Sequence, residues 1–263
     1  MNDLGGKRPG SQIVEQIRLA FGFLTILPVA PADQSSSGTV VASFRWFPLV
    51  GFAIGALLCL EDAALSLFLA PALRSALIVM SLAALTGAVH LDGLADTADA
   101  LGAGRSRTRA LDILKDVHTG AFGTVALVFA IVLKIFALAD TPAISRYTAL
   151  WLAPGLARWA MVAVAWKIEY LREKGAGTGL LGRDDSRGLI GASVIAAVAI
   201  IPVAGFHTMV ACVVAVAITI GLRAFYRRWL GGITGDLIGA AGEIVELCVL
   251  ISIAAHSSSA IRI

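Results

Sequence analysis

Long apolar segments alternate with polar ones along most of this chain. Several of the apolar segments approach the roughly 20 residues that an α-helix needs to cross a bilayer. The predicted spans cover residues 44–61, 73–90, 119–139, 143–165, 189–205, 207–223 and 239–256. We therefore expect an all-α protein, a polytopic membrane helical bundle with about seven transmembrane helices.

The first thirty residues follow a different pattern. Residues 1–10 are polar and glycine-rich, which predicts disorder. Residues 11–30 place an apolar face, beginning at Ile13, opposite a face that carries Glu15 and Arg18. This pattern is typical of a helix that lies in the membrane interface or re-enters the membrane.

Composition supports one integral-membrane domain over residues 1–263. The chain is 58% hydrophobic and 15% charged, with a mean hydropathy of +0.85, whereas roughly a quarter of a soluble domain is charged. The net charge is +3, and the basic residues are scattered without interleaved aromatic residues, so we expect no nucleic-acid partner. The three cysteines lie inside apolar runs and are predicted to be small packing residues.

The distribution of basic residues predicts the orientation. Most of the 21 lysines and arginines fall in the N-terminal segment up to Arg45 or in the polar loops 91–118, 166–188 and 224–238. Because cytoplasmic loops are enriched in lysine and arginine, we expect these loops in the cytoplasm and the C-terminus outside.

The first polar loop contains a regular acidic pattern. Asp92, Asp96 and Asp99 share one helical face, and Asp112 repeats the spacing with Asp116. Carboxylates that meet at close range repel one another, and a divalent cation removes the conflict. Mg²⁺ prefers carboxylate and water oxygens and often bridges to substrate phosphates. The alternative is a solvated loop whose aspartates balance nearby cations.

Two further segments carry candidate chemistry. Residues 231–250 combine glycines that allow close backbone approach with Asp236, Glu243 and Glu246, predicted to lean to one side of a helix. These carboxylates could instead face a polar cavity or pair with Arg158.

Residues 158–188 add cations and a glycine-rich stretch, which suit a large anionic substrate as well as an ordinary cytoplasmic loop. His90 and His118 flank the acidic pattern. We interpret both as hydrogen-bonding groups that orient neighbours, with general base or ligand as the alternative.

Several motifs together resemble the cobalamin synthase family, the adenosylcobinamide-GDP ribazoletransferases. They are HLDGLADTADA, LDILKDVHTGAFG and GGITGDLIGAAGEIVE, with FLTILPV and FRWFPLVGFAIG before them. The resemblance extends from about residue 12 to residue 250 and is distantly shared with CDP-alcohol phosphotransferases. The chain departs from the family pattern at Ala100, at Asp112 and at Val117-His118, where the family usually has glycine, glutamate and serine-arginine.

The resemblance implies a Mg²⁺-dependent transferase. Its substrates would be adenosylcobinamide-GDP and α-ribazole or α-ribazole 5′-phosphate, and GMP would leave. The implied metal ligands are Asp92, Asp96, Asp99, Asp112 and Asp116, with Asp92 and Asp116 catalytic and Asp116 either the base or a further ligand. The candidate substrate-binding residues are Lys115, His118, Arg158, Arg172, Lys174, Gly235, Asp236, Glu243 and Glu246.

The family's location implies a bacterial inner membrane, with the site facing the cytoplasm. Assembly as a homo-oligomer or with other late corrinoid enzymes stays open. Two alternative functions also remain. One is another Mg²⁺-dependent membrane transferase, of the CDP-alcohol or prenyl type. The other is an ion-coupled transporter that uses Asp236, Glu243 and Glu246 as coupling sites.

Overall fold

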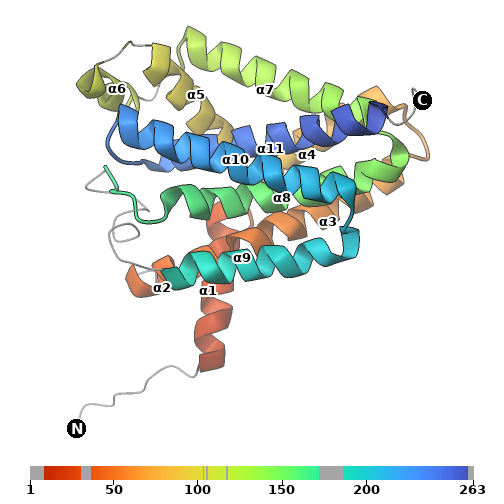
Figure 1. Cartoon of the computed structure of the whole chain (residues 1–263), viewed down its shortest axis with the longest axis horizontal. Coiled ribbons are helices and arrows are strands. Elements are labelled where there is room, and N and C mark those ends of the chain that lie inside the picture. The colour runs from red at the N-terminus through yellow and green to blue at the C-terminus, as the bar shows by residue number, and fades with distance from the viewer. Residues whose placement is uncertain are drawn as a thin grey trace.

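The computed structural model describes residues 9–30, 37–102, 104, 106–116, 118–171 and 186–259 (Figure 1). The chain is helical over most of these residues. The elements are α1 (Pro9–Leu24), α2 (Ser37–Ser43), η1 (Phe44–Trp46), α3 (Phe47–Leu65), α4 (Pro71–Leu85), α5 (Val89–Gly102), α6 (Arg107–Ile113), α7 (Ala121–Asp140), α8 (Ala143–Ala165), α9 (Ser186–Ile200), η2 (Ile201–Val203), α10 (Phe206–Trp229) and α11 (Gly235–Ser259).

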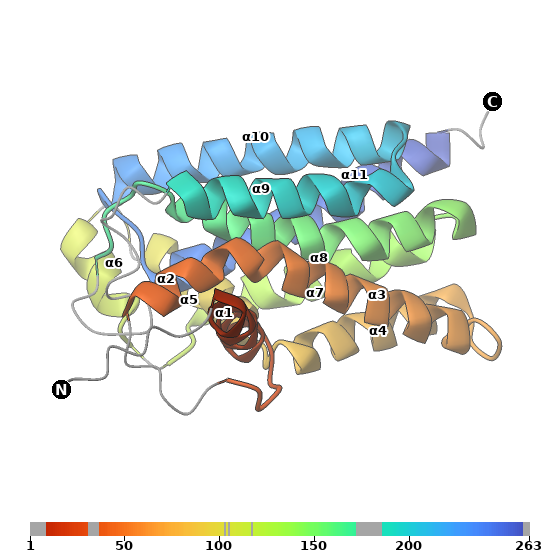
Figure 2. The same cartoon turned by 90° about the horizontal axis from the view of Figure 1, so that it is seen from below.

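The long helices run side by side along a common axis (Figures 1 and 2). Within the described residues, six helical segments are long and apolar enough to cross a membrane, and a seventh is added if the bent pair of α4 and α5 counts as one span. A helix satisfies its backbone hydrogen bonds internally, which is why a chain of apolar segments forms such a bundle in lipid. The predicted polytopic helical bundle is confirmed.

The span predicted at 73–90 is broken in the structure. Helix α4 ends at Leu85, and α5 leaves at 91° to it. Gly87 (φ 61°) and Ala88 (φ 55°) both adopt the left-handed conformation, and their amides donate to carbonyls in the last turn of α4, which ends the helix. The bend turns the acidic helix α5 away from the direction of α4.

Helices α8 and α11 form the centre of the bundle, and α8 is buried along nearly its whole length. Small residues let α3 approach α8 closely. A Cβ at Gly55 would lie 2.8 Å from the carbonyl oxygen of Leu150, and a Cβ at Gly51 would collide with the backbone at Pro154. Close backbone contact through small residues is the usual means of packing helices in a membrane.

The outer helices α7, α9 and α10 present apolar side chains at helical spacing to the outside. These exposed residues include Phe122, Val125, Phe129, Phe136, Ile190, Val194, Val198, Met209, Val213, Val216 and Ile220. Such stripes suit contact with lipid chains, in agreement with a multi-pass membrane protein.

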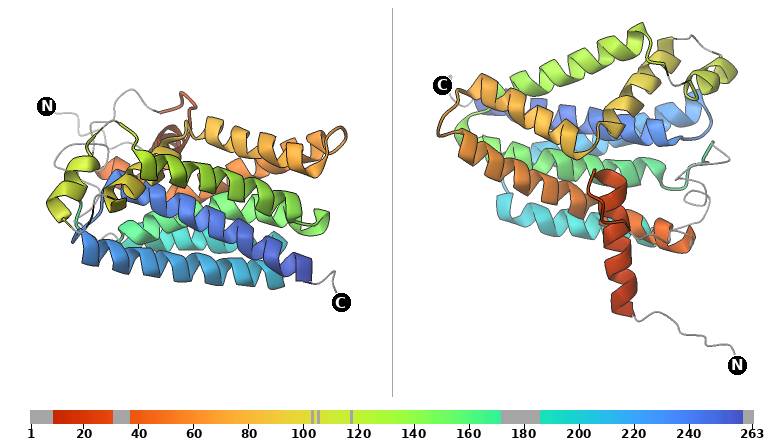
Figure 3. Two further views of the ribbon diagram at one scale, coloured as in Figure 1. Left: turned by 90° about the horizontal axis from the view of Figure 1, so that it is seen from above. Right: turned by 180° about the vertical axis from the view of Figure 1, so that it is seen from behind.

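Helix α1 lies across the bundle and projects from it (Figure 3). Ile13 and Val14 are exposed on it, whereas Leu19, Ala20 and Leu24 are buried against the bundle. A separate N-terminal helix was expected over residues 11–30, and the structure places it at Pro9–Leu24. Its position in the membrane interface stays a prediction.

The connections segregate between the two ends of the bundle. The α5–α6 segment, the end of α8 and the α10–α11 turn lie at one end, and the C-terminus lies at the other (Figures 1 and 2). The opposite end is held by a buried polar cluster in which Arg146 Nε donates to Asp62 Oδ1 at 2.8 Å and Arg146 Nη2 donates to Ser75 Oγ at 3.1 Å. This cluster ties α3, α4 and α8 together, so the acidic loop end is a separate region.

Candidate active site

Helix α5 brings the first three aspartates to the loop end of the bundle. Its other face is buried at His90, Leu91, Gly93, Ala95, Thr97 and Ala100. Asp92 is exposed, and Asp96 and Asp99 are half-buried. The i, i+4, i+7 spacing therefore forms one accessible face, as predicted.

Glycines bring the second acidic segment against α5. A Cβ at Gly93 would lie 2.7 Å from the carbonyl oxygen of Asp236, and a Cβ at Gly239 would lie 3.3 Å from the Cα of His90. Neither position has room for a side chain without movement of the partner backbone. The contact places Asp236, half-buried in the first turn of α11, beside the residue that follows Asp92.

The turn before α11 is held by the residues that follow α8. Ile233 N donates to Glu169 O at 2.8 Å, and Leu171 N donates to Ile233 O at 2.9 Å. Gly232 is packed so tightly against Leu171 that a Cβ there would lie 2.5 Å from its side chain. The sequence predicted that a backbone could approach these glycines closely. At Gly232 the close neighbours are the Leu171 side chain and the backbone carbonyl of Glu169, and Gly235 lies near the hydroxyl of Tyr170.

Asp99 has a role in the structure that its spacing did not reveal. Its Oδ2 accepts from Gly120 N at 2.7 Å and its Oδ1 accepts from Gly123 N at 2.9 Å. Asp99 therefore caps the first turn of α7 from another helix, replacing a side chain at the N-cap position. A Cβ at either glycine would overlap the carboxylate. In the sequence, the two glycines of the GAFG motif were the signal from which this close contact could have been predicted. Metal binding by Asp99 stays a prediction.

The second pair of aspartates belongs to α6 and the residues after it. Asp112 and Lys115 are exposed. Asp116 Oδ1 lies 2.7 Å from His118 Nδ1 and also accepts from His118 N at 3.1 Å. Both side chains are open to solvent. The contact fits the predicted role of His118 as a group that orients a neighbour, here the carboxylate that we predict to act in catalysis.

Glu243 and Glu246 lie deeper, inside a buried ion network. Lys134 Nζ contacts Glu243 Oε2 at 2.5 Å and Glu246 Oε1 at 2.6 Å, and Arg158 Nη1 contacts Glu246 Oε2 at 2.5 Å. Arg158 Nη2 lies 3.5 Å from His90 Nδ1, which joins the network to α5.

The pairing with Arg158 that the sequence left open is present for Glu246. The sequence did not reveal Lys134 as a partner of these glutamates, because its position showed only that a cation lies within a span. Contact of these two glutamates and Arg158 with substrate stays a prediction.

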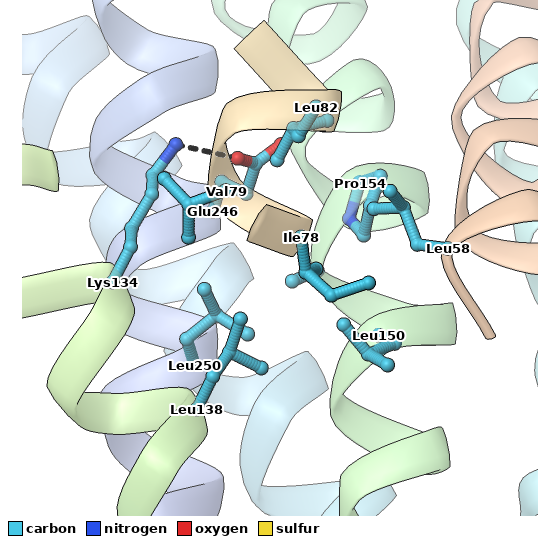
Figure 4. Close-up of a pocket in the computed structure, with 11 residues that line it drawn as sticks. Leu58, Ile78, Val79, Leu82, Lys134, Leu138, Leu150, Pro154, Glu246 and Leu250 are labelled. Carbon is cyan, nitrogen blue, oxygen red and sulfur yellow. Dashed lines mark hydrogen bonds and ion pairs between the residues drawn. The ribbon is translucent and has the colours of Figure 1, made fainter. Parts of the chain in front are cut away.

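A small cavity adjoins this network (Figure 4). Lys134 and Glu246 meet at its edge, and its other walls are apolar, formed by Leu58, Ile78, Val79, Leu82, Leu138, Leu150, Ala153, Pro154 and Leu250. Its space is about that of one water molecule, so it is too small for a substrate.

The accessibility of the acidic residues bears on the predicted magnesium site. Among the described residues, no three histidine, cysteine, aspartate or glutamate side chains are grouped so as to hold a metal ion. Mg²⁺ is commonly bound through one or two carboxylates together with substrate phosphates and water. Asp92 and Asp112 are both exposed and therefore accessible to such an ion, whereas both carboxylate oxygens of Asp99 already accept hydrogen bonds from backbone amides at the start of α7. Arg172 and Lys174 lie outside the described residues.

Comparisons with known proteins cover most of the chain. The family model for cobalamin-5-phosphate synthase matches residues 16–254. An adenosylcobinamide-GDP ribazoletransferase of Syntrophobacter fumaroxidans is 38% identical over 234 residues, which are 88% of this chain and 94% of that protein. Proteins of the same name from a Synechococcus strain and from Escherichia coli are each 35% identical, over 92% and 79% of this chain and 96% and 85% of their own lengths. No solved structure matches the chain.

Proposed function

The chain belongs to the cobalamin-5-phosphate synthase family and is a transferase of cobalamin biosynthesis, and we propose that it joins adenosylcobinamide-GDP to α-ribazole or to α-ribazole 5′-phosphate. The observation that carries this proposal is the convergence of the family's acidic and glycine motifs at one end of the bundle. Gly93 and Asp236 are in backbone contact there although they are far apart in the sequence.

The proposed reaction is a substitution at phosphorus. A hydroxyl of the ribazole attacks the phosphorus that bears the cobinamide, and the bond from that phosphorus to the oxygen of GMP breaks. The new phosphate ester is adenosylcobalamin or its phosphate. Positioning and neutralisation of charge supply most of the catalysis in such transfers.

The acidic residues have separate proposed roles. Asp92 and Asp112 would hold Mg²⁺, together with Asp96, and the ion would neutralise charge on the diphosphate. Asp116 would accept the proton of the attacking hydroxyl, with His118 fixing the direction of its carboxylate through the 2.7 Å contact. Asp236 would complete the acidic wall from the side of α11.

The site is proposed to face the cytoplasm of a bacterium, from the inner membrane. In support, the described cations Arg45, Arg107, Arg109, Lys115, Lys167, Arg187, Arg227 and Arg228 belong to segments at the loop end, whereas Arg74 and Arg146 belong to the opposite end. This is the asymmetry expected for a cytoplasmic loop end.

The decisive experiment uses purified protein in lipid nanodiscs. Adenosylcobinamide-GDP and α-ribazole are supplied with Mg²⁺ or with EDTA, and GMP and the corrinoid product are quantified. We expect Mg²⁺-dependent product in a ratio of one to one with GMP. Asp92→Asn and Asp116→Asn should each abolish product while the melting temperature is kept. Persistence of activity in both variants would contradict the assigned roles, and absence of product from folded wild-type protein would contradict the reaction.

A further inference from the structure

Helix α6 has one face packed on the protein, and that face begins with an arginine. Ala110 is fully buried and Leu114 is 2% exposed. Arg107 precedes them by three and seven residues, so it shares their face. Arg109 lies roughly 200° further around the helix and is exposed. The side chain of Arg107 is therefore directed toward the bundle, and that of Arg109 away from it.

The guanidinium of Arg107 ends beside the glycine turn before α11. A Cβ at Gly231 would lie 3.6 Å from Arg107 Nη2 and 3.7 Å from its Cζ. Gly231 has φ +72°, a conformation that favours glycine, so no side chain separates the cation from the turn. The hydrogen bonds of Ile233 to Glu169 and Leu171 hold this turn in place.

Arg107 also lacks a carboxylate partner within the part of the chain that the structure describes. The buried cations Lys134 and Arg158 are neutralised by glutamates, whereas the charge of Arg107 remains exposed and available. The Gly231 turn is followed in the chain by the first turn of α11, which contains Asp236. The backbone of Asp236 contacts Gly93, the residue next to Asp92. The Gly231 turn and the acidic helix α5 therefore lie at the same end of the bundle (Figure 1).

We propose that Arg107 binds a phosphate of the nucleotide-bearing substrate over the Gly231 turn. This inference rests on the proposed function, which supplies a substrate in which a diphosphate joins a nucleoside to its second half. A guanidinium suits that group because its planar fork can donate two hydrogen bonds to the oxygens of one phosphate. Arg107 is then a substrate-binding residue whose positive charge complements the phosphate.

The test compares Arg107→Ala and Arg107→Lys with the matched control Arg109→Ala in lipid nanodiscs. Binding of GDP in the presence of Mg²⁺ is measured by equilibrium dialysis, and KM is measured for each substrate. We expect Arg107→Ala to weaken GDP binding and to raise the KM for adenosylcobinamide-GDP by about tenfold or more, the loss typical of a charge-assisted contact. The KM for α-ribazole and the properties of Arg109→Ala should change by no more than about twofold. Arg107→Lys should recover part of the binding, because it keeps the charge but not the fork.

Three outcomes would overturn the inference: unchanged GDP binding in Arg107→Ala, equal losses in Arg107→Ala and Arg109→Ala, or no saturable GDP binding by the wild type. Failure of the proposed reaction looks different. In that case the wild type would bind GDP in an Arg107-dependent manner but form no corrinoid product from adenosylcobinamide-GDP and α-ribazole.

Discussion

The buried ion network between α7, α8 and α11 yields the sharpest prediction about stability. Two cations, Lys134 and Arg158, face two carboxylates, Glu243 and Glu246, so the formal charges cancel. Each of these side chains is at most 7% exposed. Glu246 is central, because one of its oxygens contacts Lys134 and the other contacts Arg158. Neutralising Glu246 removes both of its ion pairs and leaves one net positive charge inside the bundle.

We expect Glu246→Gln to destabilise the protein strongly. Removing one partner of a buried ion pair costs about 3–5 kcal/mol, because the charge left behind is neither solvated nor paired. For a chain of this size such a loss corresponds to a fall in melting temperature of roughly 6–20 °C. The double variant Glu246→Gln/Lys134→Met returns the network to neutrality and leaves Glu243 to compensate Arg158. It should therefore be more stable than Glu246→Gln alone.

The assay is thermal unfolding in detergent, followed with a thiol-reactive dye. Cys59, Cys212 and Cys248 are free and only partly accessible, so they report unfolding from within the spans. Asp140→Asn is the control, since Asp140 is exposed at the end of α7, and it should change the melting temperature by no more than about 2 °C. The single variant Lys134→Met is measured as well. If the loss of stability in the double variant equals the sum of the losses in Glu246→Gln and Lys134→Met, the four residues are not a coupled charge network and the reasoning is refuted.

Three further predictions concern other parts of the molecule. Asp99→Ala should lower the free energy of unfolding by about 1–2 kcal/mol, because the cap of α7 is lost. The same dye assay measures this change. A loss of Mg²⁺-dependent activity with unchanged stability would instead favour metal binding by Asp99. Ala88→Val should lower the melting temperature because a β-branched residue is strained at φ 55°, whereas Ala88→Gly should leave it unchanged or higher; equal falls for both variants would contradict this account of the α4–α5 bend. In a cysteine-free background, an impermeant maleimide should label Thr108→Cys only from the cytoplasmic side and Ser66→Cys only from the other; labelling of both from one side would contradict the predicted topology.

The order of the membrane helices and six of the predicted spans followed from the sequence alone. A helix that crosses lipid needs a continuous apolar segment, and each segment meets this requirement through its own residues, whatever its neighbours are. The spacing of Asp92, Asp96 and Asp99 on one helical face is likewise a local property, and the structure retains it. The exception was residues 73–90, where Gly87 and Ala88 together stop the helix, and continuous hydropathy conceals such a bend.

Only the tertiary structure decided which distant groups meet. The network joins Lys134 to Glu246, 112 residues away, and the close approach of α5 and α11 places Asp236 against Gly93. Such contacts depend on which helices are neighbours and on how each is rotated about its axis. Helix rotation is set by the packing of small residues across interfaces, a property of pairs of segments that the hydropathy of one segment does not contain. The sequence therefore determined the spans and their acidic faces, and the packing of the bundle determined the partner of each charge.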